Sequence, residues 1–459
     1  MNEKKILEVL EKNNQKKLLN YLNNLKDYER EKLLKELEEL NIESYFSILN
    51  KNNKSATFSF DKIEKPFVFE QGKFDIEKYR KEGEKALSNG EVAFFVVAGG
   101  QGSRLGFEHP KGLFPISPIL QKSLFQIHAE KVSAFGNLYG FSPEFFIMTS
   151  STNHDETVEF FNKFGKEWID LNNVHFFKQR DLPSVDMEGN LILSDRLTPF
   201  KAPDGHGGAL LALKNSGMID LMKKKGIKHL SYFQVDNPLV NIADPVFLGL
   251  HILEKSEVSS KVLPKRSYDE KVGVAAIVDG KPAIIEYSDL SDDLAKKRDI
   301  DGRLLFNFGS IAIHIFSVDF IDRITTDKLQ LPYHVAKKKI PYFDYETSTI
   351  KNPEKPNGIK LEQFVFDSIP MSKNAIFYET IREIEFSPLK NKEGEDSIQT
   401  CKEGISNLFK IWLKKSGVIF DDEKNCIVEI SPSFAVNMDQ LKEKINNYIK
   451  KVPKKLYLE

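Results

Sequence analysis

A run of apolar residues that ends in a glycine-rich turn constrains the fold more than any other feature of this chain. The run is Val92–Ala98, and the turn reads Gly99-Gly-Gln-Gly-Ser-Arg-Leu-Gly106, followed by Pro110-Lys-Gly112. Such a run fits a buried β-strand and is too short to span a bilayer, which takes roughly 20 residues. Glycines after a strand let a nucleotide approach the backbone closely, and free N–H groups there can point at phosphate oxygens. The pattern therefore predicts a phosphate-binding loop after a core strand.

The residues around the turn separate it from two other glycine-rich loops. A dinucleotide-binding loop reads G-x-G-x-x-G and is followed after roughly 20 residues by an acidic residue, whereas Arg104 and a Pro-Lys-Gly sequence follow here. A Walker loop needs Gly-Lys-Ser/Thr at the start of a helix. Arg104 and Lys111 supply the compact positive charge that a triphosphate needs. A dinucleotide-binding oxidoreductase stays a weaker alternative.

Composition narrows the class of protein. A chain of 459 residues suggests about three domains. Its 66 basic and 67 acidic residues give a formal charge of −1, so no overall field favours nucleic acid or an anionic membrane surface. Two cysteines exclude a disulfide framework and a thiolate metal site, and they suit a reducing compartment. Residues 1–40 lack the apolar core of a signal peptide. We therefore expect a cytoplasmic protein.

Strand and helix patterns alternate along most of the chain. The first 50 residues read as amphipathic helices, either a cap on the main body or a pair that binds a partner. A Phe-rich connector follows at 56–75. Strands are then expected at 92–98, 144–149, 174–177, 229–235, 272–278, 283–287, 310–316 and 426–430. Helices are expected at 122–135, 154–164, 209–225, 405–415 and 439–450. Such alternation favours an α/β fold with a mostly parallel sheet.

Further segments match one protein family in order and spacing. They are Ala202-Pro-Asp-Gly-His-Gly-Gly208, Val235-Asp-Asn237, Ala243-Asp-Pro245, Glu286-Tyr-Ser288, Gly302-Arg-Leu-Leu-Phe-Asn307, His334-Val-Ala-Lys-Lys-Lys-Ile-Pro341, Lys355-Pro-Asn-Gly-Ile-Lys360, Phe364-Val-Phe-Asp367 and Glu385-Phe-Ser-Pro-Leu-Lys390. Together with the glycine turn, they make the chain resemble the eukaryotic-type UDP-sugar pyrophosphorylases, and most closely the branch that makes UDP-N-acetylglucosamine. The resemblance covers nearly the whole chain.

The resemblance implies a fold and a division into domains. The fold would be α/β, with the Rossmann-like central mixed sheet of a GT-A-like nucleotidyltransferase, flanked by helices. A helical N-terminal domain would occupy residues 1–55. The catalytic domain would follow at 56–388, and a small α+β domain at 389–459 would end the chain.

The resemblance also implies a reaction. The phosphate oxygen of a sugar 1-phosphate attacks the α-phosphorus of UTP, and UDP-sugar and pyrophosphate leave without a covalent enzyme intermediate. Because two anions must be aligned and their charge stabilised, cations, backbone donors and a metal are expected instead of a Ser–His–Asp triad. Arg104, Lys111 and Lys390 are the implied catalytic residues. Asp236 is the implied ligand of Mg²⁺, since a carboxylate just after an apolar strand suits this hard cation.

The family pattern assigns substrate contacts to further positions. For the nucleotide they are Val97, Ala98, Gly99, Gly100, Gln179, Gly205 and Lys360. For the sugar they are His206, Gly273, Glu286, Tyr287, Ser310, Phe364 and Phe366. Gln179 would pair with uracil through its amide, Lys360 would face the UTP phosphates and Lys390 the sugar phosphate. Phe364 and Phe366 read as alternating aromatics on a strand, and His334 with the lysines after it reads as a solvated helix end.

Two residues depart from the N-acetylglucosamine branch of the family. His206 stands where that branch usually carries Asn, and Ser310 also replaces an Asn. N-acetylglucosamine 1-phosphate is the leading substrate, while glucose 1-phosphate or a broad set of hexose 1-phosphates is the alternative. A regulator that binds nucleotide sugars without catalysis is a third reading, which the retained cations disfavour.

Overall fold

The computed structural model describes residues 3–52, 62–326, 331–445 and 448–459. These residues form two compact units, one drawn from Met1–Ser59, Gln179–Ala209 and Gln330–Asp367, the other from Phe60–Lys178, Leu210–Leu329 and Ser368–Glu459. The first part of the predicted connector, with Phe58 and Phe60, lies outside the described residues, as does the predicted domain boundary after residue 55. Each unit is described by itself.

The first unit contains the predicted N-terminal helices. They are α1 (Glu3–Lys12), α2 (Lys16–Asn23), α3 (Asp27–Glu39) and α4 (Ile42–Asn52). Leu22, Leu33 and Leu37 are fully buried and pack with Leu182 and Val185 from a segment much later in the chain. The amphipathic pattern of the first 50 residues is therefore used to bury one face of each helix in a shared core.

Short strands complete the first unit. They are β6 (Asp181–Pro183), β7 (Val185–Asp186), β8 (Leu193–Asp195), β9 (Thr198–Pro199), β10 (Lys201–Pro203), β16 (His334–Lys338), β17 (Tyr342–Asp344), β18 (Thr349–Lys351) and β19 (Gly358–Glu362). β19 pairs with both β16 and β7. The prediction of a helix end at His334 is wrong, because β16 pairs antiparallel with β19 along its whole length.

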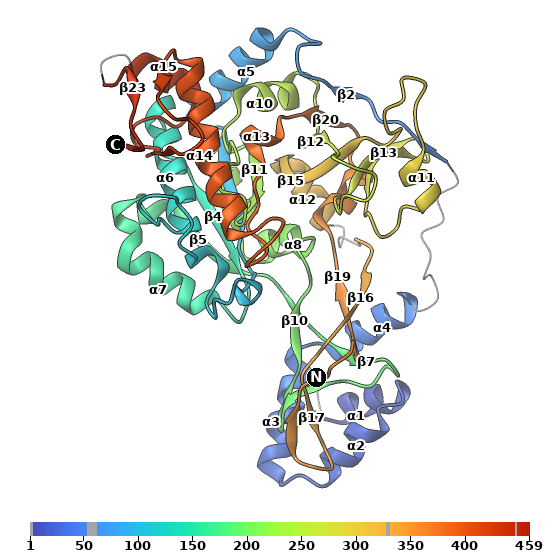
Figure 1. Ribbon diagram of the computed structural model, residues 1–459. Coiled ribbons are helices and arrows are strands. Elements are labelled where there is room, and N and C mark those ends of the chain that lie inside the picture. The colour runs from blue at the N-terminus through green and yellow to red at the C-terminus, as the bar shows by residue number, and fades with distance from the viewer. Residues whose placement is uncertain (1–2, 53–61, 327–330, 446–447) are drawn as a thin grey trace. The chain divides into compact units, whose positions relative to one another are not determined.

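An eleven-stranded mixed sheet forms the centre of the second unit (Figure 1). Its strands are β1 (Ile63–Glu64), β2 (Val68–Phe69), β3 (Val92–Val97), β4 (Phe145–Thr149), β5 (Val174–Lys178), β11 (His229–Gln234), β12 (Val258–Pro264), β13 (Val274–Val278), β14 (Lys281–Ile285), β15 (Phe308–Ser317) and β20 (Ala375–Glu379). The main order is β2-β20-β12-β15-β11-β3-β4-β5. β15 runs antiparallel to both neighbours, β12 and β11, whereas β11, β3, β4 and β5 are parallel.

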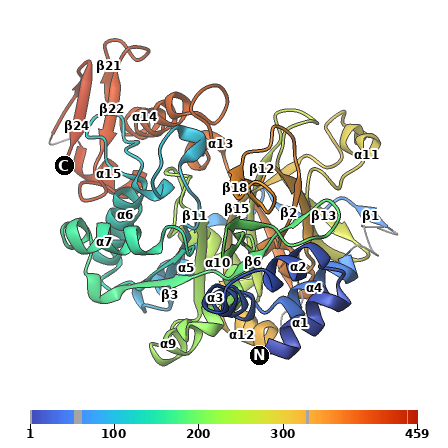
Figure 2. The same ribbon diagram turned by 90° about the horizontal axis from the view of Figure 1, so that it is seen from below.

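Helices flank this sheet. They are α5 (Ile76–Ser88), α6 (Leu124–Tyr139), α7 (His154–Phe164), α9 (Met218–Lys224), α10 (Pro245–Leu253), α11 (Asp292–Lys296), α12 (Val318–Thr326), α13 (Arg382–Glu385), α14 (Ile398–Lys415) and α15 (Met438–Ile445). α5 and α10 lie side by side in both views (Figures 1 and 2). Their contact needs glycine at two positions, because a Cβ on Gly83 would lie 1.9 Å from the Pro245 oxygen and one on Gly249 1.8 Å from the Tyr79 oxygen.

Two predicted helices differ from the structure. The pattern at 209–225 contains two helices, α8 (Gly208–Asn215) and α9, separated by Gly217 with φ of +76°. The expected terminal helix ends early, because α15 stops at Ile445 and strands β23 (Lys451–Val452) and β24 (Lys455–Leu458) follow. They pair in parallel with β21 (Ile419–Phe420) and β22 (Ile427–Ile430) respectively.

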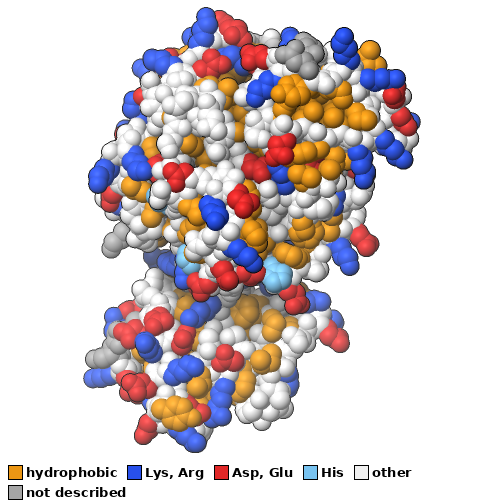
Figure 3. Space-filling view, turned by 90° about the vertical axis from the view of Figure 1, so that its left-hand side faces the viewer, with side chains coloured by type: hydrophobic (Ala, Val, Ile, Leu, Met, Phe, Trp, Pro, Cys, Tyr) orange, Lys and Arg blue, Asp and Glu red, His pale blue; other side chains and the backbone are white. Residues whose placement is uncertain are grey.

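The surface carries mixed charge, as the near-zero formal charge requires. On the face drawn in Figure 3, basic and acidic side chains are interspersed. Both cysteines, Cys401 and Cys426, are buried free thiols. Among the described helices, none combines the length and apolar character that crossing a bilayer requires.

Candidate active site

The glycine-rich turn follows β3, and backbone hydrogen bonds within the turn fix its conformation. Gly102 N donates to His109 O at 2.9 Å and Lys111 N donates to Gly100 O at 3.1 Å, which closes the turn at its base. Asn153 Nδ2 donates to Ala98 O at 2.9 Å and fixes the exit of the strand. Within the described part of the chain, the amides of Gly99 and Gly100 donate no hydrogen bond. The turn therefore presents free N–H groups, as an anion-binding loop must.

Glycine is required at two positions of this segment. A Cβ on Gly102 would lie 2.7 Å from the Phe107 oxygen, and one on Gly112 would lie 2.1 Å from the Phe125 ring. Gly100 meets nothing within 4 Å, so its open side is free to face a ligand. The glycines thus divide into two that permit tight packing and one that leaves space.

Two cations and a carboxylate lie at this edge of the sheet. Arg104 is exposed and makes no ion pair with any described residue. Lys111 is only 9% exposed, and its Nζ lies 3.8 Å from Asp236 Oδ2, which is too long for a hydrogen bond. Asp236 follows β11, the parallel neighbour of β3. Neither Lys111 nor Asp236 therefore has its charge neutralised by a close contact, and both can engage further groups.

A loop from the C-terminal part of the chain is clamped onto Asp236. Leu389 N donates to Asp236 O at 2.8 Å. The next residue, Asn237, donates from Nδ2 to Glu385 O at 2.7 Å and accepts from Ser387 N at 3.2 Å. Lys390 follows directly, and its Nζ lies 3.1 Å from Asp396. The side-chain amide of Asn237 thereby holds the loop that leads to Lys390 against the residue next to Asp236.

A cavity of about 150 Å³ joins predicted residues from five separate segments. Its walls include Asp236, Gly273, Glu286, Ser310 and Lys390. A Cβ on Gly273 would lie 2.7 Å from the Ile284 side chain, so the close packing of Gly273 against β14 has no room for a larger residue unless Ile284 shifts. The cavity thus combines two carboxylates, a hydroxyl and a lysine, groups that can bind sugar hydroxyls and phosphate.

The floor of this cavity has an unusual backbone. Ala312 in β15 has φ of +55°, a left-handed conformation that costs a non-glycine residue about 1–2 kcal/mol. It lies beside a register shift between β12 and β15 at Ser260 and Val262. Ser310 Oγ accepts a 3.4 Å hydrogen bond from Ala312 N. The bulge therefore sets the direction of the Ser310 side chain.

A buried ion cluster lies behind the clamped loop. Lys261 of β12 is fully buried, and its Nζ contacts Asp244 Oδ2 at 2.6 Å and Glu385 Oε1 at 2.5 Å. Thr380 donates to the second oxygen of Glu385 at 2.9 Å. Burial raises the pKa of Glu385, while Lys261 favours its charged form. The cluster joins β12 and α10 to the start of the loop that carries Lys390.

The first unit holds the other predicted substrate positions. Gly205 has φ of +86°, and a Cβ there would lie 2.5 Å from Gln363 O. Val365 N donates to His206 Nδ1 at 3.2 Å. The His206 ring stacks on Phe364 at a centroid distance of 5.3 Å and lies 5.9 Å from Phe366. These aromatics do not stand on a strand as expected, because a 3-10 helix, Val365–Met371, begins after Phe364.

His334 extends this aromatic cluster, and Asp204 lies in the same unit, where its carbonyl accepts from Gln363 N; the sequence prediction selected neither. His334 contacts the Phe364 ring at 4.4 Å and Asp367 at 2.9 Å through Nε2. Asp204 is fully buried, 3.3 Å from Arg180 Nε, and burial raises its pKa to about 6. The sequence could have pointed to Asp204, because it stands in the Pro-Asp-Gly-His motif directly before two selected residues, Gly205 and His206. For His334, only the strand pairing of β16 shows its position.

The remaining predicted residues are less closely grouped. Gln179 is buried in the first unit, where Lys360 Nζ contacts Glu362 at 3.0 Å. Tyr287 is 44% exposed and does not line the small cavity, although its neighbour Glu286 does. Val97 and Ala98 end β3 directly before the turn. Asn237, Lys261 and Ala312 are the residues of the second unit that sequence reasoning did not select.

These features define a class of protein. A glycine turn after a parallel strand, flanking cations and a carboxylate at the next strand end are the parts of a nucleotidyltransferase, which aligns two phosphates without covalent catalysis. The described residues contain no cluster of three or more His, Cys, Asp or Glu side chains placed to hold a metal.

Comparison with known proteins identifies the family. The chain belongs to the UTP–glucose-1-phosphate uridylyltransferase family, whose model matches residues 41–456. It is therefore a UDP-sugar pyrophosphorylase in the broad sense, an enzyme that transfers a nucleotidyl group.

Relatives with curated names point to one branch of this family. The probable UDP-N-acetylglucosamine pyrophosphorylase of Dictyostelium discoideum is 36% identical over 94% of this chain and 93% of its own length. The UDP-N-acetylglucosamine pyrophosphorylase of Saccharomyces cerevisiae is 38% identical over 80% of this chain and 79% of its own.

Solved structures agree with this assignment. A crystal structure described as that of a "putative UDP-N-acetylglucosamine pyrophosphorylase" from Entamoeba histolytica has a TM-score of 0.79 at 34% identity, over 87% of this chain and all of that one. The crystal structure of the UDP-N-acetylglucosamine pyrophosphorylase from Trypanosoma brucei, in complex with an inhibitor, has a TM-score of 0.83 at 26% identity, over 100% of this chain and 98% of that one.

Proposed function

We propose that this enzyme converts UTP and N-acetylglucosamine 1-phosphate into UDP-N-acetylglucosamine and pyrophosphate. The observation that carries the proposal is the small cavity in which Asp236, Glu286, Ser310 and Lys390 meet close to the Lys111 side chain. The names of the relatives support the choice of sugar.

Different residues would bind the two anionic substrates, the sugar 1-phosphate and UTP. Lys390 would hold the phosphate of the sugar 1-phosphate, and the free amides of Gly99 and Gly100 would hold the triphosphate. The sugar phosphate oxygen forms a bond to the α-phosphorus of UTP, and the bond from this phosphorus to the bridging oxygen breaks. Pyrophosphate leaves with that oxygen, and Arg104 and Lys111 would stabilise its charge.

Asp236 fits a Mg²⁺ ion. Magnesium commonly takes one or two protein carboxylates and completes its octahedron with phosphate oxygens and waters. Asp236 offers an incompletely paired carboxylate beside the cation that would bind the same phosphates. A bound Mg²⁺ would supply charge stabilisation at the triphosphate. The two buried free thiols suit a reducing compartment, and we place the reaction in the cytoplasm.

A second candidate substrate is glucose 1-phosphate or a broader set of hexose 1-phosphates. His206 and Ser310 favour this alternative, because both replace the amide side chain of the N-acetylglucosamine branch. His206 accepts a backbone hydrogen bond and stacks on Phe364, so the ring has a fixed orientation. Ser310 is shorter than Asn and leaves part of the small cavity unfilled.

One assay tests the function and ranks the sugars. Pyrophosphate release is measured with UTP and Mg²⁺ against a panel of sugar 1-phosphates that includes N-acetylglucosamine, glucose and galactose. We expect the highest kcat/KM with N-acetylglucosamine 1-phosphate. In the variant His206→Asn, its kcat/KM relative to glucose 1-phosphate should rise about fivefold, the effect of one hydrogen bond. No pyrophosphate release with any sugar would refute the proposed function.

A further inference from the structure

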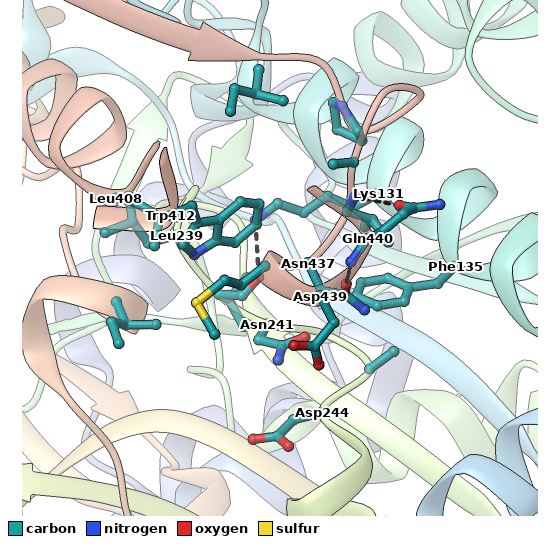
Figure 4. Close-up of a pocket in the computed structure, with 18 of the residues that line it drawn as sticks. Lys131, Phe135, Leu239, Asn241, Asp244, Leu408, Trp412, Asn437, Asp439 and Gln440 are labelled. Carbon is teal, nitrogen blue, oxygen red and sulfur yellow. Dashed lines mark hydrogen bonds between the residues drawn. The ribbon is translucent and has the colours of Figure 1, made fainter. Parts of the chain in front are cut away.

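The charged residues labelled in the larger cavity of the second unit have partners within the protein. This cavity has a volume of about 460 Å³, and Figure 4 shows Lys131, Asp244 and Asp439 in its wall. Asp244 pairs with Lys261 at 2.6 Å. Asp439 contacts Arg80 at 3.4 Å, and Lys131 donates to two backbone carbonyls. The charges of these three residues are therefore engaged within the fold.

Asp204, in the first unit, is a buried carboxylate that joins separate segments of the chain. It is fully buried, and its Oδ2 lies 3.3 Å from Arg180 Nε. Asp204 N donates to Arg180 O at 3.1 Å, and Asp204 O accepts from Gln363 N at 2.7 Å. Its side chain and its backbone therefore both connect to the segment at 180, and its carbonyl connects to the segment at 363.

The residues next to this ion pair have open polar groups. Gln179 directly precedes Arg180, and Gly205 directly follows Asp204. Gln179 is only 7% exposed, and its side-chain amide makes no hydrogen bond with any described residue. The N–H of Gly205 also donates to no residue that the structure describes. A side-chain amide and a backbone N–H are thus both available to a ligand.

Two open groups of this kind can select one nucleobase. Uracil presents an N–H beside carbonyl oxygens, so a carboxamide can accept from the N–H and donate to an oxygen. Cytosine carries an amino donor where uracil has a carbonyl acceptor. A backbone N–H cannot turn over to accept from that amino group. Groups held in fixed positions therefore discriminate between the two bases, and groups that are free to shift do not.

The loop that carries Gly205 is closely packed around the carboxylate. A Cβ on Gly208 would lie 2.1 Å from Asp204 Oδ1, and one on Gly205 would lie 2.5 Å from Gln363 O. Oδ1 accepts no hydrogen bond from any described residue. Because a buried charge without partners is costly, the ionised carboxylate depends on its contact with Arg180.

We propose that Asp204 is a positioning residue for base selection, and that its ionised carboxylate, held by Arg180, keeps Gln179 and Gly205 where they select uracil. This inference rests on the proposed function, in which UTP is the nucleotide. Without the charge, Arg180 loses its buried partner, and the backbone next to Gln179 is held less firmly. UTP then binds less tightly and is less preferred over CTP, because the phosphate contacts are common to both nucleotides.

The charge of Asp204 changes within an accessible pH range. Burial raises its pKa to about 6, although Arg180 acts in the opposite direction. Asp181 also faces the carboxylate from β6, and Tyr333 faces it from the segment before β16. Glu362 in β19 lies next to the Gly205 backbone. Asp204 is therefore ionised at about pH 8 and mostly protonated at about pH 5.

Calorimetric titration with UTP and with CTP, without a sugar 1-phosphate, tests the proposal. The variant Asp204→Asn keeps the shape of the side chain but not its charge. At about pH 8 we expect its Kd to rise about tenfold for UTP and about twofold for CTP. At about pH 5 its Kd for UTP should be within about twofold of wild type, because both side chains are then neutral. This comparison cancels the titration of UTP itself, and the exposed control Asp195→Asn should match wild type throughout.

A second variant keeps the proposal testable if Asp204→Asn does not fold. The Arg180 side chain is 43% exposed, so Arg180→Met should fold. It should lower the preference for UTP over CTP about threefold, and Arg180→Lys should restore part of it. Equal losses for both nucleotides, a Kd ratio that does not change with pH, or an unchanged preference would overturn the proposal. Wild-type protein that does not bind UTP would refute the proposed function itself, whereas UTP binding that is independent of Asp204 and Arg180 would refute only this inference.

Discussion

Lys111, which we propose to bind a phosphate, is an unusual lysine in this chain. Most lysines of this chain are solvated or paired, whereas Lys111 is 9% exposed and its Nζ is 3.8 Å from the carboxylate of Asp236. The ammonium is partly desolvated, and the one nearby carboxylate is too distant for a hydrogen bond. In such surroundings, a phosphate oxygen gains more from the lysine than it would in water.

Loss of this ammonium should affect catalysis far more than folding. We expect Lys111→Ala to lower kcat/KM about 100-fold, the effect of removing one preorganised donor from a charged transition state. Steady-state pyrophosphate release measures the change, and the exposed control Lys166→Ala should match wild type. Unchanged kcat/KM in Lys111→Ala would remove Lys111 from the site.

At the scale of single elements, the buried cluster around Lys261 fixes the loop that carries Lys390. Substituting Lys261 by Met should lower the free energy of unfolding by about 3–5 kcal/mol, because Asp244 and Glu385 would remain buried without their cation. Urea denaturation followed by circular dichroism measures this loss. In Glu385→Gln the lysine keeps Asp244, so a smaller loss is expected. Equal stability of Lys261→Met and wild type would show that the cluster contributes little.

Hydrophobic patterns were a good guide to elements and a poor guide to their ends. The strand predicted at 92–98 is present as β3 (Val92–Val97), one residue shorter, and the helix predicted at 154–164 is α7 (His154–Phe164). The helix break at Gly217 was missed, since a glycine near a helix centre can be tolerated as well as terminate it. The aromatics at Phe364 and Phe366 alternate like a strand, but they flank and begin a 3-10 helix. Period-2 patterns over three residues cannot distinguish these structures.

At the scale of the whole molecule, buried histidines make stability depend on pH. Burial lowers the pKa of His128 to about 3 and of His229 to about 4, and it lowers that of His251 well below its ordinary value of 6.5. Each group binds its proton more readily after unfolding, so its stabilising contribution is complete above pH 6.5 and is lost as the pH falls toward 4. Glu385, whose raised pKa acts in the opposite sense, offsets part of this loss.

Acidification from pH 6.5 to 5 should therefore lower the stability of the second unit. Each histidine contributes about 1 kcal/mol per pH unit, so we expect a net loss of about 2 kcal/mol or more. Both tryptophans, Trp168 and Trp412, lie in this unit, so urea denaturation followed by their fluorescence reports on it. The variant His128→Gln should show a shallower pH dependence. A constant or rising free energy of unfolding would contradict the assignment.

The order of strands was the main feature that the sequence could not provide. The glycine turn, Asp236 and Lys390 could be selected from their motifs, but their meeting with Glu286 and Ser310 depends on β15 lying antiparallel between β12 and β11. Pairings between strands far apart in sequence leave no periodic signal in a single chain. The same holds for Asn237 and Lys261, whose roles arise from contacts with a loop about 120–150 residues away. The predicted domain boundaries at 55 and 388 and the roles of the site residues stay predictions.

The clamp made by Asn237 has a consequence for how new acceptor specificity could arise. It links the residues proposed for the metal and the sugar phosphate through hydrogen bonds, whereas Glu286 follows β14 and Ser310 lies in β15. Laboratory selection for other sugars can therefore change Glu286 and Ser310. Asp236 and Lys390, which every sugar 1-phosphate would need, can stay unchanged. Changes in the length of the 385–390 segment, by contrast, would abolish turnover of all sugars alike.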